Sequence, residues 1–386
     1  MPEGLTESYP ETVVRPVFLV DRSVFLSYSA YIRRILVGLS SGRARVSALV
    51  CPSCADSQTI LCPSVERIEH PALRLPIFWS QNRKILLDHL LRFKPTILHT
   101  FSPGQVHLAK WLSKQLQLPF VVTCHENPSR WSCFKNPIHH AARVIAPSKP
   151  IADRLAEKCP GLEDRIEQIY IGSFVEDQCS CFSHGGHVAS LVAVHPLNSL
   201  KLFAPFLNAV RHLVLDGFEV MVALMGTGKA EKAIRAHIRK LGLTSLVTVV
   251  PPIRPMQSVL SGADVYLHLS DSGVFDAQLL EAMAVGLAVV GVPETTSGLL
   301  HDGQTAAFWD SADELNIYGC LKNVLGQREK SRQLAQNAQA YLRNQNSVSR
   351  MVDKLMNTYI QAQQSHKQSL KTPDESPASP PQSSLG

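Results

Sequence analysis

Two glycines mark a place in this 386-residue sequence where backbone could come very close to a bound ligand. Gly226 and Gly228 stand between an apolar, strand-like run that ends at Met225 and a helical pattern that starts near Ala230. Glycine adopts positive φ angles and has no Cβ, so such a turn can present backbone N–H groups to an anion. A purely structural strand-to-helix turn explains the pair equally well.

A second candidate for chemistry is the pair Cys51 and Cys54, whose CxxC spacing occurs in zinc and redox sites. No second CxxC follows at zinc-finger spacing. Cys179 and Cys181 are too close to each other in sequence to form such a motif, and they lie too far along the chain from Cys54. We therefore predict no metal site and interpret these residues as small loop cysteines. The nine cysteines also lack regular spacing, which argues against a disulfide framework.

Any functional site must be held in place by strands and helices, which the sequence shows as short apolar runs that alternate with helical patterns. Strands are predicted at 16–20, 45–50, 96–100, 120–124, 143–146 and 166–171, and again at 190–194, 219–225, 246–250, 265–269 and 288–292. Helical periodicity falls between them, at 105–115, 149–158, 202–215, 230–241 and 277–285. This alternation indicates parallel βαβ units, and strands that are apolar throughout are typical of a sheet covered on both faces.

The alternation stops at residues 173–187, which show no periodicity and are predicted to link two domains. The fold class is therefore α/β, with two doubly wound, Rossmann-like domains at 1–180 and 188–345 that face a cleft. Residues 346–364 are predicted to form a helix that crosses back onto the first domain. Residues 365–386, rich in Ser, Pro and Lys, are predicted to be a disordered tail. Ligands bind at the carboxyl ends of such strands, so the cleft is the expected site.

Charge and hydropathy limit the partners of the chain. Its net charge is +6, with the surplus of Lys and Arg in the first half, and no basic run carries interleaved aromatic residues. Nucleic acid is therefore not an expected partner. The weakly basic face is either an ordinary solvated surface or a peripheral contact with an anionic membrane. The sequence has no apolar run of about 18 residues and no signal-peptide pattern at its start, so we predict a cytoplasmic protein.

Four segments of the second half resemble, in order and spacing, the donor domain of family 4 glycosyltransferases. They are residues 224–228, 262–270, 279–290 and 297–305. The first half resembles the family less closely, at residues 97–100, at His125 after a strand, at 146–148 and at 170–174. The resemblance implies a GT-B fold in which the first domain faces the acceptor and the second binds a nucleotide sugar.

The resemblance also implies an activity. Such enzymes transfer a sugar, here expected to be a hexose, from a nucleotide-diphosphate sugar with retention at the anomeric carbon. They need no bound divalent metal, and no other cofactor is expected. The leaving diphosphate gains negative charge, which fixed cations, backbone amides and a helix dipole must meet. The acceptor, whether a glycan, a lipid or a small molecule, is not encoded in any recognisable motif.

Glu281 matches the family's second glutamate, and the resemblance implies that its carboxylate binds the ribose hydroxyls of the donor. A carboxylate suits two neighbouring hydroxyl donors, although an acid here could also simply favour the helix dipole. The family's first glutamate, which contacts the donor sugar, lies eight positions earlier, where this chain has Gly273. Asp271 or Asp276 could take its place, or could be a loop acid and a helix cap.

Other matches concern the diphosphate and the donor sugar. Lys201 matches a lysine that would hold the diphosphate as a point charge. The family's arginine falls at Pro196, or at His195 with a shift of one residue. The backbone amides that face the diphosphate match three consecutive residues, Ser297, Gly298 and Leu299. Together with Gly226 and Gly228 they form the predicted donor-binding loops. His125 matches a histidine that points into the cleft, or is a locally bonded loop histidine.

The first strand is followed by residues 21–25 without the glycine pair that the family has near the acceptor and the diphosphate. The catalytic candidates are thus His125, Lys201 and Glu281, and three functions remain open. An active glycosyltransferase is the first. A non-catalytic relative that binds a nucleotide or a partner is the second, and Gly273 and Pro196 favour it. A nucleotide-sugar epimerase is the third, and it would need paired acid and base groups in the cleft.

Overall fold

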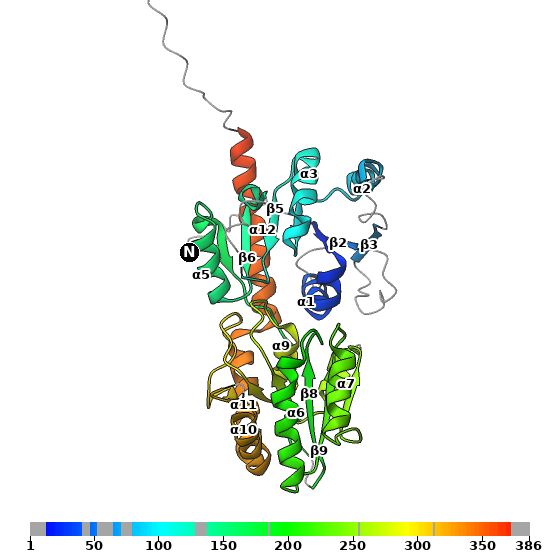
Figure 1. Cartoon of the computed structure of the whole chain (residues 1–386). Helices are drawn as coiled ribbons and strands as arrows, with labels where there is room; N and C mark the ends of the chain where they lie inside the picture. The colour runs from blue at the N-terminus through cyan, green and yellow to red at the C-terminus, as the bar shows by residue number, and fades with distance from the viewer. Residues whose placement is uncertain are drawn as a thin grey trace, which may run out of the picture.

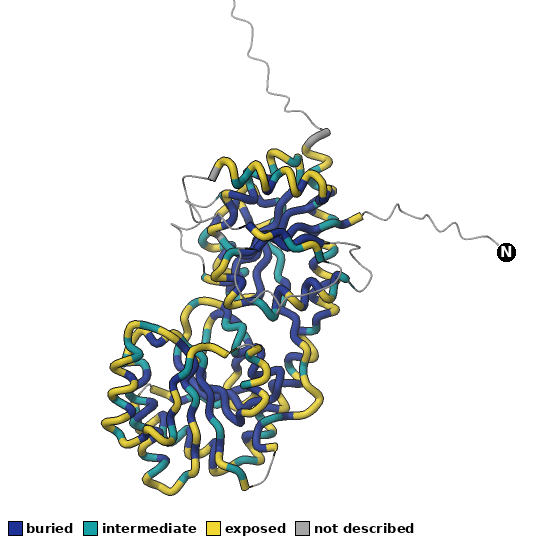
Figure 2. Tube along the Cα trace, turned by 90° about the vertical axis from the view of Figure 1, so that its right-hand side faces the viewer, coloured by how far each residue is buried: buried dark blue, intermediate teal, exposed yellow. Residues whose placement is uncertain are grey.

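The computed structural model describes residues 13–40, 47–51, 65–70, 79–127, 137–183, 186–253, 255–311 and 313–371. These residues form two α/β domains that lie one above the other in Figure 1, each built on a parallel sheet. The buried strands run through the middle of each domain, and exposed helix faces surround them (Figure 2). The predicted fold class of two doubly wound domains is confirmed.

The first sheet has seven strands in the order β3-β2-β1-β4-β5-β6-β7, all parallel. Its strands are β1 (Pro16–Leu19), β2 (Ser47–Cys51), β3 (Val65–Glu69), β4 (Ile97–Thr100), β5 (Phe120–Thr123), β6 (Arg143–Ala146) and β7 (Ile166–Gln168). The helices of this domain are α1 (Arg22–Ser40), α2 (Trp79–Phe93), α3 (Val106–Leu116) and α5 (Lys149–Lys158). Strand order reverses between β1 and β4, which is where a doubly wound sheet opens its binding crevice.

The second sheet has six parallel strands in the order β10-β9-β8-β11-β12-β13. They are β8 (Ala189–Val194), β9 (Val220–Met225), β10 (Val247–Val250), β11 (Val265–His268), β12 (Ala288–Gly291) and β13 (Ala306–Phe308). Its helices are α6 (Leu200–Leu215), α7 (Glu231–Lys240), α8 (Met256–Leu260), α9 (Ala277–Ala284), α10 (Glu314–Gly326) and α11 (Arg328–Gln345). Here the order reverses between β8 and β11.

The last helix, α12 (Val348–Lys371), packs on the first domain, as Figure 1 shows. The Tyr359 hydroxyl lies 2.7 Å from Nδ1 of His99 on β4, and Gln363 donates to Thr96 before that strand. A Cβ on Gly38 would lie 2.5 Å from a methyl of Val352, so α1 and α12 approach closely. The chain thus closes the first domain with its own C-terminal helix.

Two strands and the end of one helix differ from the predictions. Strand β3 was not predicted, because this edge strand of sequence Val-Glu-Arg-Ile-Glu is charged and only Ile68 in it is buried. Strand β13 has three residues, too few for a pattern. Helix α12 continues to Lys371 and so includes the first part of the predicted disordered tail. The polar residues of this part extend a helix that is already packed on the first domain. Residues 372–386 lie outside the described part.

Helix α9 carries Glu281 and lies between the domains. All residues from Leu279 to Ala284 are buried. The helix contacts α1 of the first domain, α8, α11, β11 and β12. Burial on every side fixes the orientation of each α9 side chain.

Most cysteines within the described ranges are free thiols, in agreement with their irregular spacing. Cys51, Cys124, Cys179, Cys181 and Cys320 are unbonded. Cys159 is disulfide-bonded, which the spacing did not predict. Cys54 lies outside the described residues, so the CxxC pair is not seen in full. In the described ranges, no helix has both the length and the apolar character to span a membrane.

Candidate functional site

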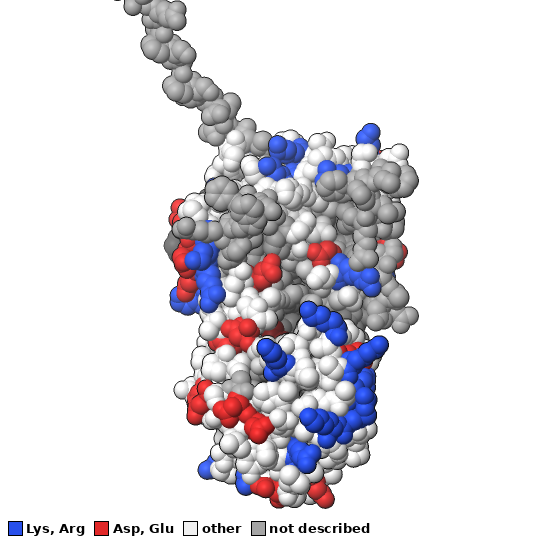
Figure 3. Space-filling view, in the orientation of Figure 1, with Lys and Arg blue, Asp and Glu red and all other residues white. Residues whose placement is uncertain are grey.

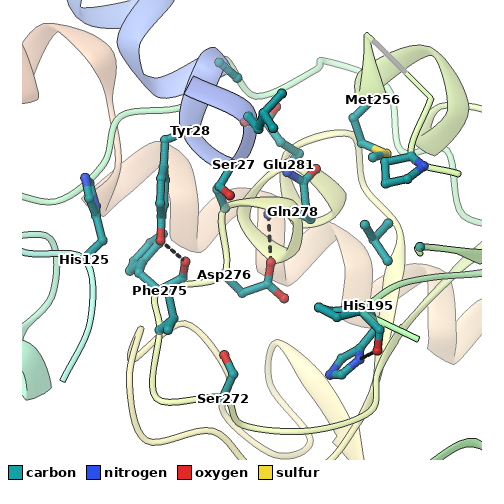
Figure 4. Close-up of a pocket in the computed structure, with 18 of the residues that line it drawn as sticks. Ser27, Tyr28, His125, His195, Met256, Ser272, Phe275, Asp276, Gln278 and Glu281 are labelled. Atoms are coloured by element: carbon teal, nitrogen blue, oxygen red, sulfur yellow. Dashed lines mark hydrogen bonds between the residues drawn. The ribbon is translucent and has the colours of Figure 1, made fainter. Parts of the chain in front are cut away.

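A cavity of about 1020 Å³ lies between the two domains, and Figure 4 shows part of its lining. The first domain contributes the start of α1 and the residues His125 and Glu126 that follow β5. The second domain contributes α9 and the loops that follow β8, β9 and β11. The carboxyl ends of strands from both sheets therefore face this cavity, as the fold class predicts.

Helix α1 begins at Arg22, and only Val20 and Asp21 separate it from the end of β1, which leaves no room for a glycine-rich loop. Asp21 starts it by accepting a 2.8 Å hydrogen bond from the backbone N–H of Val24. The helix is interrupted at Tyr28, whose φ and ψ are −125° and 22°. The kink lets the Tyr28 hydroxyl donate a 2.9 Å hydrogen bond to the carbonyl of Phe275 in the second domain. The side of the cavity that the first domain contributes is thus built by helical turns.

A short backbone seam joins the two domains beside the cavity. The N–H of Phe275 donates to the carbonyl of His125 at 2.7 Å, and the N–H of Asn127 donates to that of Gly273 at 2.8 Å. Glu126 and Val274 form the antiparallel bridge between these bonds. Gly273, with φ of 70°, therefore takes part in a contact between domains at the position of the family's first glutamate.

Glu281 lies in the cavity lining, as predicted, but it already has a partner. Nη2 of Arg34 on α1 lies 2.6 Å from Oε2 of Glu281, and both side chains are less than 10% exposed. Arg34 also donates from Nη1 to the carbonyl of Gly172 at 3.2 Å. Among the described residues, no side chain or backbone donor is bonded to Oε1 of Glu281. One oxygen of the carboxylate is thus left for a ligand.

His125 lines the cavity but sits within an aromatic cluster. Its ring stacks on Tyr28 at 4.1 Å between centroids and meets Tyr31 edge-on at 5.6 Å. In Figure 4, the Tyr28 ring lies between His125 and the other labelled cavity residues. Burial lowers the pKa of His125 to about 3, and neither ring nitrogen has a hydrogen-bond partner within the described structure. The imidazole of His125 is therefore neutral, and the Tyr28 ring separates it from a ligand in the rest of the cavity.

The two aspartates that could replace the first glutamate are engaged elsewhere. Asp276 is the N-cap of α9, and its Oδ1 accepts from the N–H groups of Gln278 and Leu279 at 2.9 and 3.1 Å. Asp271 accepts from Thr295 and Thr296 across the loop. The helix-cap interpretation of Asp276 is therefore correct, and a carboxylate already neutralises the N-terminus of α9.

The loop at Ser297, Gly298 and Leu299 differs from the prediction. The carboxylate of Glu294 accepts from the N–H of Ser297 at 2.6 Å and from the N–H of Leu299 at 3.2 Å. It also accepts from the hydroxyl of Ser297 at 2.5 Å and from the N–H of Thr296 at 2.9 Å. None of the three predicted residues lines the cavity, whereas Glu294 does. The amides expected to face a diphosphate are bonded to the protein's own carboxylate.

The predicted glycine turn serves to bring two loops together. A Cβ on Gly226 would lie 2.0 Å from the carbonyl oxygen of His195, and one on Gly228 would lie 2.4 Å from the backbone of Leu197. Gly226 also lines the cavity, and Gly228 does not. Lys201 is exposed at the start of α6, outside the cavity lining, between the lining residues Ser199 and Leu202. The structural interpretation of the glycines is therefore sufficient, and Lys201 is not among the residues that line the cavity.

Charge in the cavity is predominantly negative. The ionised side chains among its described lining residues are six acids and two arginines, namely Asp21, Glu126, Asp271, Asp276, Glu281, Glu294, Arg33 and Arg34. Most of the acids are held by donors of the protein itself, as shown above for Asp271, Asp276, Glu281 and Glu294. No group of three or more His, Cys, Asp or Glu in the described ranges is placed to hold a metal ion.

Sequence reasoning missed Arg34, Tyr28 and Glu294. Arg34 had a usable signal, because it occupies a position on the buried face of α1 beside Tyr31 and Ile35. A charged residue within an apolar stripe predicts a buried partner. Glu294, which is followed three residues later by a serine, had only the general pattern of a capped turn.

Comparison with known proteins agrees with this architecture. The family model "Glycosyltransferase Family 4" matches residues 29–173, and "Glycosyl transferases group 1" matches residues 189–327. No curated protein is similar enough in sequence to count as a match.

Several solved structures are similar in fold. A glycosyltransferase from Rickettsia africae has 14% identity and a TM-score of 0.72, and the match covers 91% of this chain and 99% of that one. HepE from Anabaena, solved with UDP and glucose, has 14% identity and a TM-score of 0.71, with 89% and 99% covered. Sucrose-phosphate synthase from Thermosynechococcus elongatus has 14% identity and a TM-score of 0.67, with 92% and 99% covered. The two Rossmann-like domains therefore have the GT-B arrangement.

Proposed function

The chain belongs to the family 4 and group 1 glycosyltransferases, and we propose that it transfers a hexose from a nucleotide-diphosphate sugar to an acceptor. The observation that carries this proposal is the position of Glu281, buried on α9 with one oxygen free at the interdomain cavity. A carboxylate in this position can accept from two neighbouring ribose hydroxyls of a nucleotide. HepE, which shares the fold, was solved with UDP and with UDP-glucose, and this favours a uridine nucleotide as the first donor to test.

Retention at the anomeric carbon and independence of metal are part of the proposal. Both follow from the family resemblance, as does the division of labour between an acceptor domain and a donor domain. Charge that develops on the leaving diphosphate needs a positive group, and Arg33 is the lining arginine to which the described structure gives no partner. We propose that Arg33, from the first domain, meets this charge in place of Lys201.

The test is release of nucleotide from UDP-, GDP- and ADP-sugars by the full chain, with and without a pool of glycan and lipid acceptors. We expect release with one nucleotide class, its persistence in EDTA, and loss in Glu281→Ala. Nuclear magnetic resonance of the product gives the anomeric configuration. Equal release by the wild type and Glu281→Ala would overturn the assignment of this site.

A non-catalytic relative is the second candidate, and two contacts favour it. The carboxylates of Asp276 and Glu294 bond the amide groups of α9 and of the loop at 296–299. Each places negative charge where a diphosphate would gain from N–H groups. Binding of a nucleotide without turnover on any donor would establish this second function.

Location and surface contacts are also proposals. Lys and Arg side chains gather over α7 on the second domain in Figure 3, where Lys232, Arg235, Arg239 and Lys240 are exposed. We propose a cytoplasmic protein that touches an anionic membrane surface peripherally through such a face. Flotation with vesicles that contain phosphatidylserine, at low and high salt, tests it. We expect binding at low salt that is lost when Lys232 and Lys240 are changed to Glu.

A further inference from the structure

We propose that Arg34 is a positioning residue that aims the free oxygen of Glu281 at the donor and makes this orientation depend on contact between the two domains. The inference rests on the proposed function, since it takes Glu281 as the group that binds the ribose. It adds a residue from the acceptor-side domain to the donor site. No motif in the sequence assigns this role to Arg34.

The contacts of Arg34 hold it in one place. Its two terminal nitrogens donate to different segments, Nη2 to Glu281 at 2.6 Å and Nη1 to the carbonyl of Gly172 at 3.2 Å. The guanidinium carbon also lies 5.9 Å from the centre of the Phe174 ring. A planar, rigid fork bound at two points leaves its partner little freedom. The carboxylate of Glu281 is therefore fixed through Oε2 alone.

Burial explains why Glu281 needs this partner. The residue is 6% exposed, within a helix whose residues from Leu279 to Ala284 are all buried. A buried carboxylate without a cation or several donors is costly. Among the described residues Arg34 supplies the one hydrogen bond and ion pair to this carboxylate. Without Arg34, we expect the side chain of Glu281 to seek other donors and leave the orientation that presents Oε1.

The two partners belong to different domains, and this creates the coupling. Arg34 lies on α1 and Glu281 on α9, two helices in contact across the interdomain boundary. If the domains separate, Glu281 loses its partner, and the ribose site loses its orientation. By thermodynamic linkage, a nucleotide that binds the oriented carboxylate favours the closed arrangement of the domains.

The experiment uses the ribose as the probe. Calorimetry with UDP, GDP and ADP first identifies the nucleotide that the wild-type chain binds most tightly. The same nucleotide and its 2′,3′-dideoxy analogue are then titrated into the wild type, Glu281→Gln, Arg34→Lys and Arg34→Gln. Lysine keeps the charge but cannot contact Glu281 and Gly172 together.

We expect the wild type to prefer the ribonucleotide over the dideoxy analogue by about tenfold or more, as for a charge-assisted hydrogen bond. Both Arg34 variants should lose most of this preference and bind the dideoxy analogue as the wild type does. In turnover, the KM for the donor should rise while kcat per folded molecule changes little, because a ribose contact is the same in ground and transition states.

Ser148→Ala is the control for the loss of an interdomain contact. Ser148 donates to the carbonyl of Thr296 across the boundary and does not touch Glu281. It should keep the full ribose preference. The inference would be overturned if Glu281→Gln abolished the ribose preference while Arg34→Lys kept it, that is, if Arg34→Lys lowered the affinity for both nucleotides equally or for neither. A wild type with no ribose preference would instead overturn the proposed role of Glu281.

Discussion

The carboxylate of Glu294 lies 2.6 Å from the backbone nitrogen of Ser297, within the loop whose amides were predicted to face a diphosphate. The N–H groups of Thr296 and Leu299 donate to the same carboxylate. A second internal acid, Asp276, occupies the first amides of α9. Both amide groups near the cavity thus already bind an anion of the protein itself, which limits how a nucleotide can bind there.

Removing the Glu294 carboxylate should strengthen nucleotide binding. In Glu294→Ala, the N–H groups of Thr296 and Ser297 lose their acceptor, whereas that of Leu299 keeps the Ser297 hydroxyl. One negative charge also leaves the cavity lining, and the space of the lost side chain lets a phosphate oxygen approach these amides. We expect UDP to bind about tenfold more tightly in calorimetry, equivalent to one charge-assisted hydrogen bond. The free energy of unfolding without ligand should fall by about 1–3 kcal/mol, because buried amides lose their partner.

Glu329→Ala is the matched control for this change. Glu329 is an exposed acid in the first turn of α11 and does not line the cavity. It should leave the UDP affinity unchanged. If Glu294→Ala bound UDP less tightly than the control, the Glu294 carboxylate would have to support the nucleotide site rather than compete with it.

Restoring the family's first glutamate by Gly273→Glu should not increase turnover. The φ of Gly273 is 70°, a region that costs residues with a Cβ about 1–2 kcal/mol. A Cβ there would lie 3.4 Å from Nδ2 of Asn127 in the other domain, an ordinary van der Waals contact, so the cost comes from the backbone conformation. We expect urea unfolding to show a loss of about 1–2 kcal/mol in both Gly273→Glu and Gly273→Ala. A Glu variant with higher turnover than the Ala variant would show that the loop can present a carboxylate to the donor.

Much of the fold follows from local patterns. Strands such as Val265–His268 and Ala288–Gly291 are apolar throughout because helices cover both faces of their sheets, so their runs are easy to find. Strand β3 follows no such rule, because at the edge of the sheet its Glu66 and Glu69 face solvent. A charged edge strand of this kind lacks the apolar run by which the other strands are recognised.

The candidate site was only partly predictable. Glu281 could be placed in the cleft because its helix follows the strand that points there. Its partner Arg34 lies 247 positions away, and the pair exists only because the two domains meet at α1 and α9. The contact that occupies the amide of Leu299 is a local one. The order of residues cannot show that a nearby glutamate bends back to bind the loop amides.

Stability should decrease as the pH falls below about 6.5, because two buried histidines are neutral in the folded chain. Burial lowers the pKa of both His99 and His125 to about 3, against an ordinary value of 6.5. A lowered pKa in the folded state means that the unfolded chain binds protons first. Each histidine therefore contributes stability above pH 6.5 that is lost as the pH falls toward 3.

The expected loss between pH 6.5 and 5.5 is about 1 kcal/mol for each histidine, measured by urea unfolding, because the unfolded histidines are only half protonated at the upper end of this range. His125→Phe keeps the aromatic stack and should remove about half of the combined loss. His99 should account for the other half, since it remains bonded to Tyr359 and Thr123. An unchanged loss in His125→Phe would mean that His125 is already protonated or exposed in the folded chain.

The ring of Tyr28 should control whether His125 can exchange protons with a ligand. The two rings stack at 4.1 Å, and Tyr28 lies between His125 and the rest of the cavity. In Tyr28→Ala, water and ligand reach the imidazole, and desolvation no longer opposes its charge. We expect nuclear magnetic resonance titration to show the pKa of His125 rising from about 3 toward its ordinary range.

Tyr28→Phe separates this screening role from the hydrogen bond that the Tyr28 hydroxyl makes. The variant loses the 2.9 Å bond to the carbonyl of Phe275 but keeps the stacked ring. We expect the pKa of His125 to stay low, while the free energy of unfolding falls by about 1 kcal/mol. A raised pKa in Tyr28→Phe would show that the contact between the domains, rather than the ring itself, keeps water from His125. In that case Tyr28 would govern the cavity by holding Phe275, and the chemistry of His125 would depend on domain closure.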